Sequence, residues 1–148
     1  MRGRTGKWFE CIVQYEKVTE DGREKKVRES YVVEAVCFGD AETTIGEILQ
    51  GWGIGDFEVV NINPTQYKEV FISEDKTADL WYKAKLQFII IDEKTEKEKR
   101  SNVYYLVQAE SFDQAKKNIE EVMRNSITDY TILEVKETNI IELFEYEE

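Results

Sequence analysis

The chain of 148 residues carries one pattern twice: residues 8–71 align with residues 81–144 at an offset of 73 or 74 positions, almost without gaps. Internal repetition constrains the architecture more than any single motif, because both copies must fold into the same kind of unit. It leaves the chemistry open. The matched positions are Trp8-Phe9 with Trp81-Tyr82, Tyr31-x-Val33-x-Ala35 with Tyr105-x-Val107-x-Ala109, Phe38-x-x-Ala41-x-x-x-Ile45 with Phe112-x-x-Ala115-x-x-x-Ile119, and Phe71 with Phe144.

Each copy opens with a two-residue period, which predicts a strand that has one buried and one wetter face. A turn follows, marked in the first copy by Asp21-Gly22, and this dipeptide is a strong hairpin signal. A returning strand completes the hairpin. One buried and one wetter face suits an antiparallel sheet. The buried stripes are Phe9, Cys11, Val13, Tyr15 and Tyr82, Ala84, Leu86, Phe88, Ile90, and the mixed faces carry Glu10, Ile12, Gln14 and Lys83, Lys85, Gln87.

A helix is predicted after each hairpin. In the second copy Ser111-x-x-Gln114 matches a capping box, in which serine and glutamine each satisfy a backbone N–H at the helix start. The helix is expected to stop at Gly51 in the first copy and near Asn125 in the second, both suited to a left-handed terminus. A long strand then follows, interrupted in the first copy at Pro64, where a bend or an edge position is expected because proline cannot donate to a ladder.

These patterns predict an α+β protein of two tandem β-β-α-β units with antiparallel sheets and pseudo-twofold symmetry, the last strand of each unit being long or broken in two. The units either pack their apolar faces together or join their sheets edge to edge. A linker this short keeps the units from swinging freely, so one compact body is expected. The predicted parts are a basic N-terminal arm (1–7), the first repeat (8–72), a polar linker (73–79) and the second repeat with an acidic C-terminal end (80–148).

The charge balance restricts the partners that the chain can bind. A net charge of −11, from 31 acidic and 20 basic residues, argues against a simple electrostatic grip on nucleic acid. No apolar run approaches the roughly 20 residues of a membrane span. The first seven residues lack the apolar stretch of a signal peptide. We therefore predict a cytoplasmic protein with no membrane partner.

Little in the sequence points to catalysis. The chain has no histidine, which removes the commonest general base and the commonest nitrogen ligand of metals. Cys11 and Cys37 are too few for a disulfide framework or a zinc site of thiolates. The glycine-rich run 51–55 follows a helix, whereas a phosphate-binding loop precedes one. We predict no enzyme and no cofactor or metal, although paired carboxylates between the repeats could serve a small ligand or a reaction.

Two features recur away from the presumed core. Trp8 and Trp81 lie in phase with the mixed face, where they could stack on nucleic-acid bases or pack against the other unit. Basic residues also follow both turns, where they could contact a partner or simply protect a charged hairpin edge from aggregation. The candidate contacts with nucleic acid or a partner are Trp8, Trp81, Arg23, Lys25, Lys26, Lys97, Lys99 and Arg100.

The whole pattern from Trp8 to about Tyr146 resembles an uncharacterised bacterial family, the domain of unknown function numbered 4494, which occurs in gut Bacteroidetes and their phages and mobile elements. The resemblance rests on Trp8-Phe9-Glu10-Cys11, Trp81-Tyr82-Lys83, Glu96-Lys97-Glu98-Lys99-Arg100 and Leu106-Val107-Gln108-Ala109. It implies an accessory role in phage or mobile-element biology and transfers no functional residue. The basic N-terminal arm departs from the family pattern.

Three functions follow as expectations. The first is a non-catalytic binding module that acts through protein partners or self-association. The second is single-stranded nucleic-acid binding through the paired tryptophans and the basic hairpin arms. The third, of a different class, is a ligand binder or enzyme that uses carboxylates between the repeats.

Overall fold

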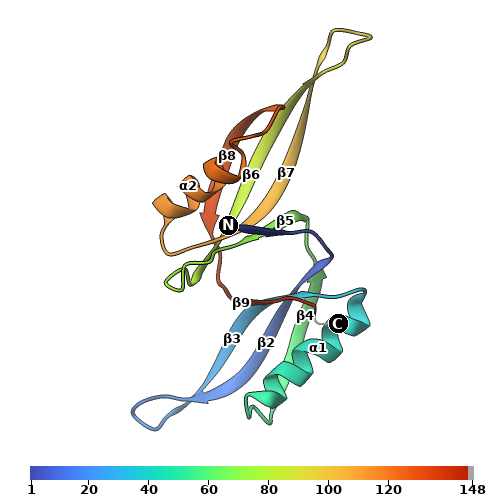
Figure 1. Ribbon diagram of the computed structural model, residues 1–148. Coiled ribbons are helices and arrows are strands. Elements are labelled where there is room, and N and C mark those ends of the chain that lie inside the picture. The colour runs from blue at the N-terminus through green and yellow to red at the C-terminus, as the bar shows by residue number, and fades with distance from the viewer. Residues whose placement is uncertain (147–148) are drawn as a thin grey trace. The chain divides into compact units, whose positions relative to one another are not determined.

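The computed structural model describes residues 1–146, which form two compact units that are each discontinuous in sequence (Figure 1). The α1 unit consists of Gly6–Gln66 and the described residues from Asn139 to Tyr146. The α2 unit consists of Met1–Thr5 and Tyr67–Thr138. The described residues contain two helices and nine strands in two sheets, so the predicted α+β class is confirmed.

The α1 unit is a four-stranded sheet in the order β4-β2-β3-β9, with α1 packed on one face (Figure 1). Its core lies between the helix and this face, because Phe9, Cys11 and Val13 of β2 alternate toward Ile45 and Leu49 of the helix. The predicted buried stripe of the first strand is thus correct in phase. The elements are β2 (Trp8–Val18), β3 (Glu24–Glu34), α1 (Phe38–Gly51), β4 (Phe57–Pro64) and β9 (Ile140–Phe144).

α1 ends at the predicted glycine, but the left-handed conformation expected there occurs two residues later. Gly51 is the last helical residue, and Gly53 takes the left-handed conformation with a φ of 81°. The N–H of Gly53 donates to the carbonyl of Gln50, and the N–H of Ile54 donates to the carbonyl of Leu49. This pair of hydrogen bonds is a Schellman motif, which satisfies carbonyl groups that the helix leaves without a partner.

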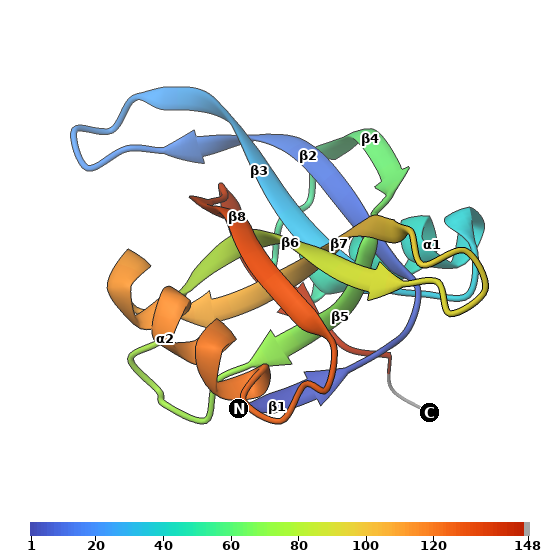
Figure 2. The same cartoon turned by 90° about the horizontal axis from the view of Figure 1, so that it is seen from above.

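The α2 unit is a five-stranded sheet in the order β1-β5-β7-β6-β8, with α2 packed against β6, β7 and β8 (Figure 2). Ala84 and Leu86 of β6 pack with Val107 of β7 and Ile119 of the helix in the core of this unit. The elements are β1 (Arg2–Arg4), β5 (Tyr67–Ile72), β6 (Leu80–Ile91), β7 (Glu98–Ala109), α2 (Phe112–Val122) and β8 (Asp129–Glu137).

Half of the predicted capping box forms at the start of α2. The hydroxyl of Ser111 accepts a hydrogen bond from the N–H of Gln114 at 3.2 Å. The Gln114 side chain does not reach back; it donates to Oδ1 of the buried Asn118 at 2.8 Å. The amide nitrogen of Asn118 in turn donates to the carbonyl of Gln108 at 3.2 Å. A buried polar group needs such partners. The Gln114 side chain therefore provides a hydrogen bond to the buried Asn118 side chain instead of to a backbone N–H at the start of the helix.

Two strands lie in a different unit from the strand that precedes them in the sequence. β5 follows β4 of the α1 unit after Pro64, but it pairs in parallel with β7 of the α2 unit, with Val107 opposite Phe71. β9 follows β8 of the α2 unit after Thr138, but it pairs in parallel with β3 of the α1 unit, with Val33 opposite Phe144. We call this arrangement the strand exchange. Because of it both sheets are mixed, which corrects the prediction of antiparallel sheets.

The compact units therefore do not follow the boundaries of the sequence copies. The chain passes from one unit to the other between residues 5 and 6, 66 and 67, and 138 and 139. Residues 73–79, which were predicted to link the units, connect β5 to β6 inside the α2 unit. Residues 2–4 of the basic arm form β1, which pairs antiparallel with β5. None of the helices among residues 1–146 is long and apolar enough to cross a membrane.

Candidate functional site

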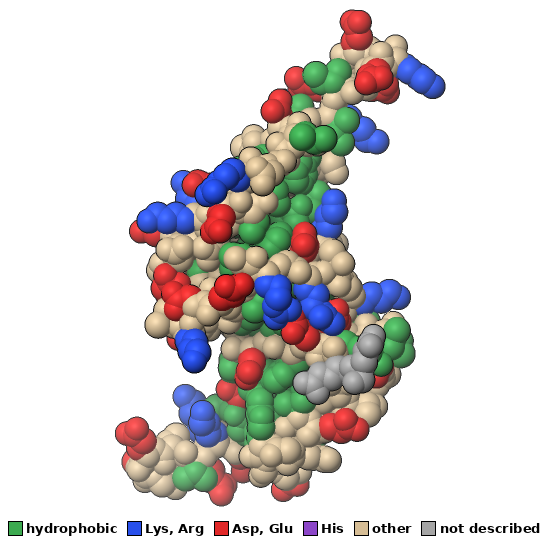
Figure 3. Space-filling model, in the orientation of Figure 1, with side chains coloured by type: hydrophobic (Ala, Val, Ile, Leu, Met, Phe, Trp, Pro, Cys, Tyr) green, Lys and Arg blue, Asp and Glu red, His purple; other side chains and the backbone are tan. Residues whose placement is uncertain are grey.

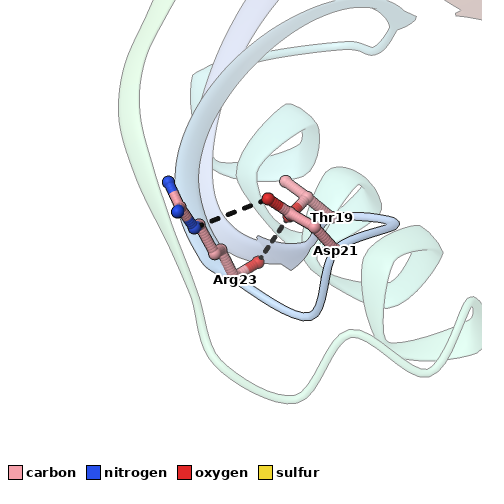
Figure 4. A network of polar contacts seen from close by, with 3 residues as sticks. All are labelled: Thr19, Asp21 and Arg23. Carbon is pink, nitrogen blue, oxygen red and sulfur yellow. Dashed lines mark hydrogen bonds and ion pairs between the residues drawn. The ribbon is translucent and has the colours of Figure 1, made fainter.

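The turn between β2 and β3 is organised by its own polar contacts (Figure 4). The hydroxyl of Thr19 donates to the Asp21 carboxylate and lies 3.1 Å from the carbonyl oxygen of Arg23. The hydrogen bond from Thr19 lowers the pKa of Asp21. Nε of the exposed Arg23 lies 3.5 Å from Oδ2 of the same carboxylate. Exposed ion pairs of this kind contribute little to stability, so Arg23 can change partner at little cost.

The other predicted basic residues are all exposed on the two hairpin arms, the projecting parts of β2–β3 and β6–β7. Lys25 and Lys26 lie on β3, while Lys97 and Lys99 lie at the start of the second return strand. Arg100 contacts Glu98, with 3.7 Å between Nη2 and Oε2. Figure 3 shows acidic and basic side chains mixed at the end of the β6–β7 hairpin.

Each arm carries as many acids as bases. Residues 16–29 contain five of each, and residues 92–100 contain four of each. A protein that holds a polyanion by charge alone needs an excess of cations at the contact. The arms do not supply that excess, although the six basic side chains predicted as contacts are all exposed.

The two tryptophans are buried, which corrects the expectation that they lie on a wet face. Trp8 is 2% exposed and Trp81 is 4% exposed. The carbonyl of Trp8 accepts from the N–H of Thr65 at 2.8 Å, and that of Trp81 accepts from the N–H of Thr138 at 2.9 Å. A buried indole offers no face for stacking on a base, so the proposals below do not use these residues.

A groove of about 830 Å³ in the α1 unit brings one predicted residue into a concave site. One wall is the β2–β3 arm, and the other is the segment from the end of α1 to the start of β4. β4 pairs with β2 only as far as Tyr15, which lies opposite Phe57. Among the described residues, Glu16, Lys17 and Val18 therefore have no strand partner on the groove side. The lining residues are Gln14, Tyr15, Glu16, Lys17, Val18, Glu24, Lys26, Gly53, Ile54, Gly55, Asp56, Phe57 and Glu58.

The chemistry of this groove is mixed. Lys17 and Lys26 lie among four carboxylates, and Val18, which is 67% exposed, gives the groove an apolar wall. The hydroxyl of Tyr15 donates to the Glu29 carboxylate. Desolvation, the hydrogen bond and the charge of Glu29 raise the pKa of Tyr15 to about 12, so this hydroxyl stays protonated at neutral pH.

Sequence reasoning identified Lys26 and missed the rest of the groove. The glycines at 53 and 55 were interpreted as a flexible helix exit, and they do leave the helix, but they also form a wall. A usable signal existed in the strand lengths: β2 has 11 residues and β4 has 8, so β2 must extend past its neighbour.

The β6–β7 arm also has an open strand edge, but its exposed side chains are apolar. The pairing of β6 with β8 ends at Ile89, opposite Asp129. Beyond it Ile91 is 64% exposed, and Ile90 is 49% exposed, which corrects its place in the predicted buried stripe, because the sheet neighbour on this side ends at Ile89. Exposed apolar side chains on an open strand edge invite pairing with another chain.

The two cysteines differ enough to give a simple test of the fold. Cys37 is exposed and Cys11 is fully buried, and burial, followed by the charge of Glu10, raises the pKa of Cys11 to about 12. Because the thiolate is the reactive form, Cys37 will react with a thiol reagent at pH 8 at least about a hundredfold faster than Cys11. Absorbance on titration with a chromogenic disulfide should show one fast thiol per chain, and none in Cys37→Ser. Two equally fast thiols would contradict the buried position of Cys11.

No group of three or more His, Cys, Asp or Glu side chains among residues 1–146 is placed to hold a metal ion. A family model described as Domain of unknown function (DUF4494) matches residues 7–146. No curated protein and no solved structure was found to match the chain.

Proposed function

The chain belongs to the DUF4494 family of unknown function, and we propose that it acts as a non-catalytic binding module whose α1 unit takes up an extended segment of a protein partner. The observation that carries the proposal is the open edge of β2 at Glu16–Val18, which borders the groove. A strand edge offers backbone N–H and C=O groups at regular spacing. An extended peptide can pair with them as an added strand.

The groove supports this ligand class beyond the backbone. Val18 and Phe57 can contact apolar side chains of a bound strand, while Lys26 and Glu58 can pair with charges of either sign. Alternating apolar and charged residues are the pattern of a half-buried strand. Gly53 and Gly55 carry no side chain, and nothing lies within 4 Å of the place where a Cβ would be, so this wall leaves room for the occupant.

The repetition of the sequence supports a wider proposal, that the chain arose by duplication and retains pseudo-twofold symmetry. The β2–β4 ladder has an irregularity between Ile12 and Val13, and the β6–β8 ladder has one between Lys85 and Leu86, which are the aligned positions. The resemblance to a family of phages and mobile elements supports an accessory role there, in the bacterial cytoplasm. Self-association belongs to the same proposal.

The test is a selection of random extended peptides against the full chain, followed by fluorescence anisotropy with the selected peptide. Val18→Asp will weaken binding at least tenfold, because it places a charge in the apolar wall of the groove. Lys26→Glu will change the affinity for peptides that carry an acidic residue.

The matched control is Ile91→Asp, which puts the same charge at the aligned position of the other arm. Affinity in this variant should stay within twofold of the unaltered chain. The proposal fails if no selected peptide binds below about 100 μM, or if Val18→Asp and Ile91→Asp weaken binding equally.

A further inference from the structure

We propose that the sheet face of the α2 unit that is turned away from α2 binds single-stranded nucleic acid on its exposed part, which begins at Lys83 and Tyr104, next to the buried Trp81 and Leu106. On β6 the side chains Tyr82, Ala84 and Leu86 pack under the helix. Because successive side chains of a strand point to opposite faces, Lys83 and Lys85 lie on the other face. This site is distinct from the groove, which belongs to the α1 unit.

The register brings an aromatic ring to the same face. Tyr104 of β7 lies opposite Lys85 of β6. Nζ of Lys83 lies 4.8 Å from the centroid of the Tyr104 ring, and Nζ of Lys85 lies 5.9 Å from it. Both ammonium groups are thus held over one half-buried ring by cation–π attraction. A base can stack on this ring by displacing the two ammonium groups from its face, and the displaced cations can then contact the adjoining phosphates.

Polar groups continue this face along the same two strands. The amide of Gln87 donates to Oδ1 of Asn102 at 3.2 Å, and these two residues form the next cross-strand pair on this face after Lys85 and Tyr104. The next pair on the same face is Ile89 with Arg100. Amides and an arginine on an open sheet give hydrogen-bond donors and acceptors to base edges, which are accessible in a single strand.

This face carries a small excess of basic side chains. Lys83, Lys85, Arg100 and Lys136 lie on it, and Lys136 is directly opposite Lys83 on β8. The acidic residues on the same face are Glu134, opposite Lys85, Asp129, opposite Ile89, and Glu98, opposite Ile91. Charges more than about 10 Å away are largely screened at 0.1 M salt, so a polyanion at this face meets the local cations more than the net −11.

The aromatic ring decides between two polyanions. An acidic peptide would use the ammonium groups and leave the Tyr104 ring without a role. A nucleic-acid strand uses both, because every base has a face that can stack. We therefore commit to a single strand, and an acidic peptide becomes an outcome that would overturn the proposal.

The experiment measures the fluorescence anisotropy of a labelled twelve-residue oligothymidylate with the full chain at about 0.1 M salt. The double variant K83E/K85E will lose at least tenfold in affinity. Tyr104→Leu, which keeps an apolar side chain and removes the ring, will lose about tenfold, in line with the usual contribution of one stacked base. The matched control is K116E/K117E, which makes the same charge change on the exposed surface of α2, and it will stay within threefold.

Three results would overturn the inference. The first is no change in anisotropy up to about 200 μM protein. The second is an equal loss in K83E/K85E and K116E/K117E, since that would mean that net charge alone sets the affinity. The third is binding of a twelve-residue polyglutamate as tight as that of the oligonucleotide, with Tyr104→Leu without effect. Circular dichroism of each variant checks that the fold is retained.

Discussion

Phe71→Ala will destabilise the α2 unit by about 3 kcal/mol, although Phe71 belongs to the sequence copy that forms most of the α1 unit. Phe71 is 6% exposed, and its ring centroid lies 5.5 Å from that of Tyr105. It packs in the core that contains Leu86 and Val107. Truncation removes these contacts and leaves a cavity, which together account for the expected loss.

Amide hydrogen exchange followed by mass spectrometry will locate the damage. Exchange in β6 and β7 should rise about a hundredfold, the factor that corresponds to the expected loss of stability. Exchange in β2 and β3 should change much less. The matched variant is Phe144→Ala, at the aligned position, whose effect should fall on the α1 unit. Faster exchange confined to the α1 unit in Phe71→Ala would contradict the strand exchange.

Ending the chain after Asn139 will remove β9 and cost the α1 unit on the order of 5 kcal/mol. The deletion removes the buried Ile140 and the ring of Phe144, and it leaves the edge of β3 without its parallel partner. Typical domains have only about 5–15 kcal/mol of stability, so much of the α1 unit should unfold or aggregate.

Trp52 provides the readout for this deletion. Its ring centroid lies 5.8 Å from that of Phe144 and 5.7 Å from that of Tyr31, so its fluorescence depends on β9. A synthetic peptide of residues 139–148, added in trans, should restore the signal. Deleting residues 1–5 is the control, since it removes the three-residue edge strand β1 from the α2 unit and should leave Trp52 unchanged. An unchanged denaturation midpoint of the α1 unit after loss of β9 would contradict the register with β3.

The order of elements could be predicted because its signals are local. Asp21-Gly22 lies in the first hairpin turn, Ser111 caps α2, and β4 ends at Pro64 on an edge of its sheet. Each of these features depends on a few neighbouring residues. Period-two alternation likewise placed Phe9 and Leu86 toward the helices.

The strand exchange could not be predicted in this way. Val70 and Phe71 are apolar and would suit either sheet, since alternation records which face a side chain takes and not which strand lies beside it. The choice depends on contacts between residues far apart, such as Tyr31 with Glu142 and Tyr105 with Glu69.

The candidate sites show the same division. Lys83 and Lys85 could be assigned to the mixed face of their strand, but their neighbour Tyr104 is placed by the register of β6 with β7. Lys26 could be identified as a basic hairpin residue, but the groove around it depends on how far β2 extends beyond β4. Burial of Trp8 remained one of two alternatives because phase alone does not say what covers a face.

The pairing of β9 with β3 also determines when the α1 unit can be finished on the ribosome. Ser30 pairs with Ile140, so 110 further residues must be synthesised before this strand meets its neighbour. At common elongation rates that takes roughly 5 to 20 s. During this interval β3 presents an uncovered edge to every nascent chain nearby, including others of the same sequence on one polysome. The α1 unit, most of which is synthesised before most of the α2 unit, is therefore completed last, and its exposure to misassembly is set by translation speed.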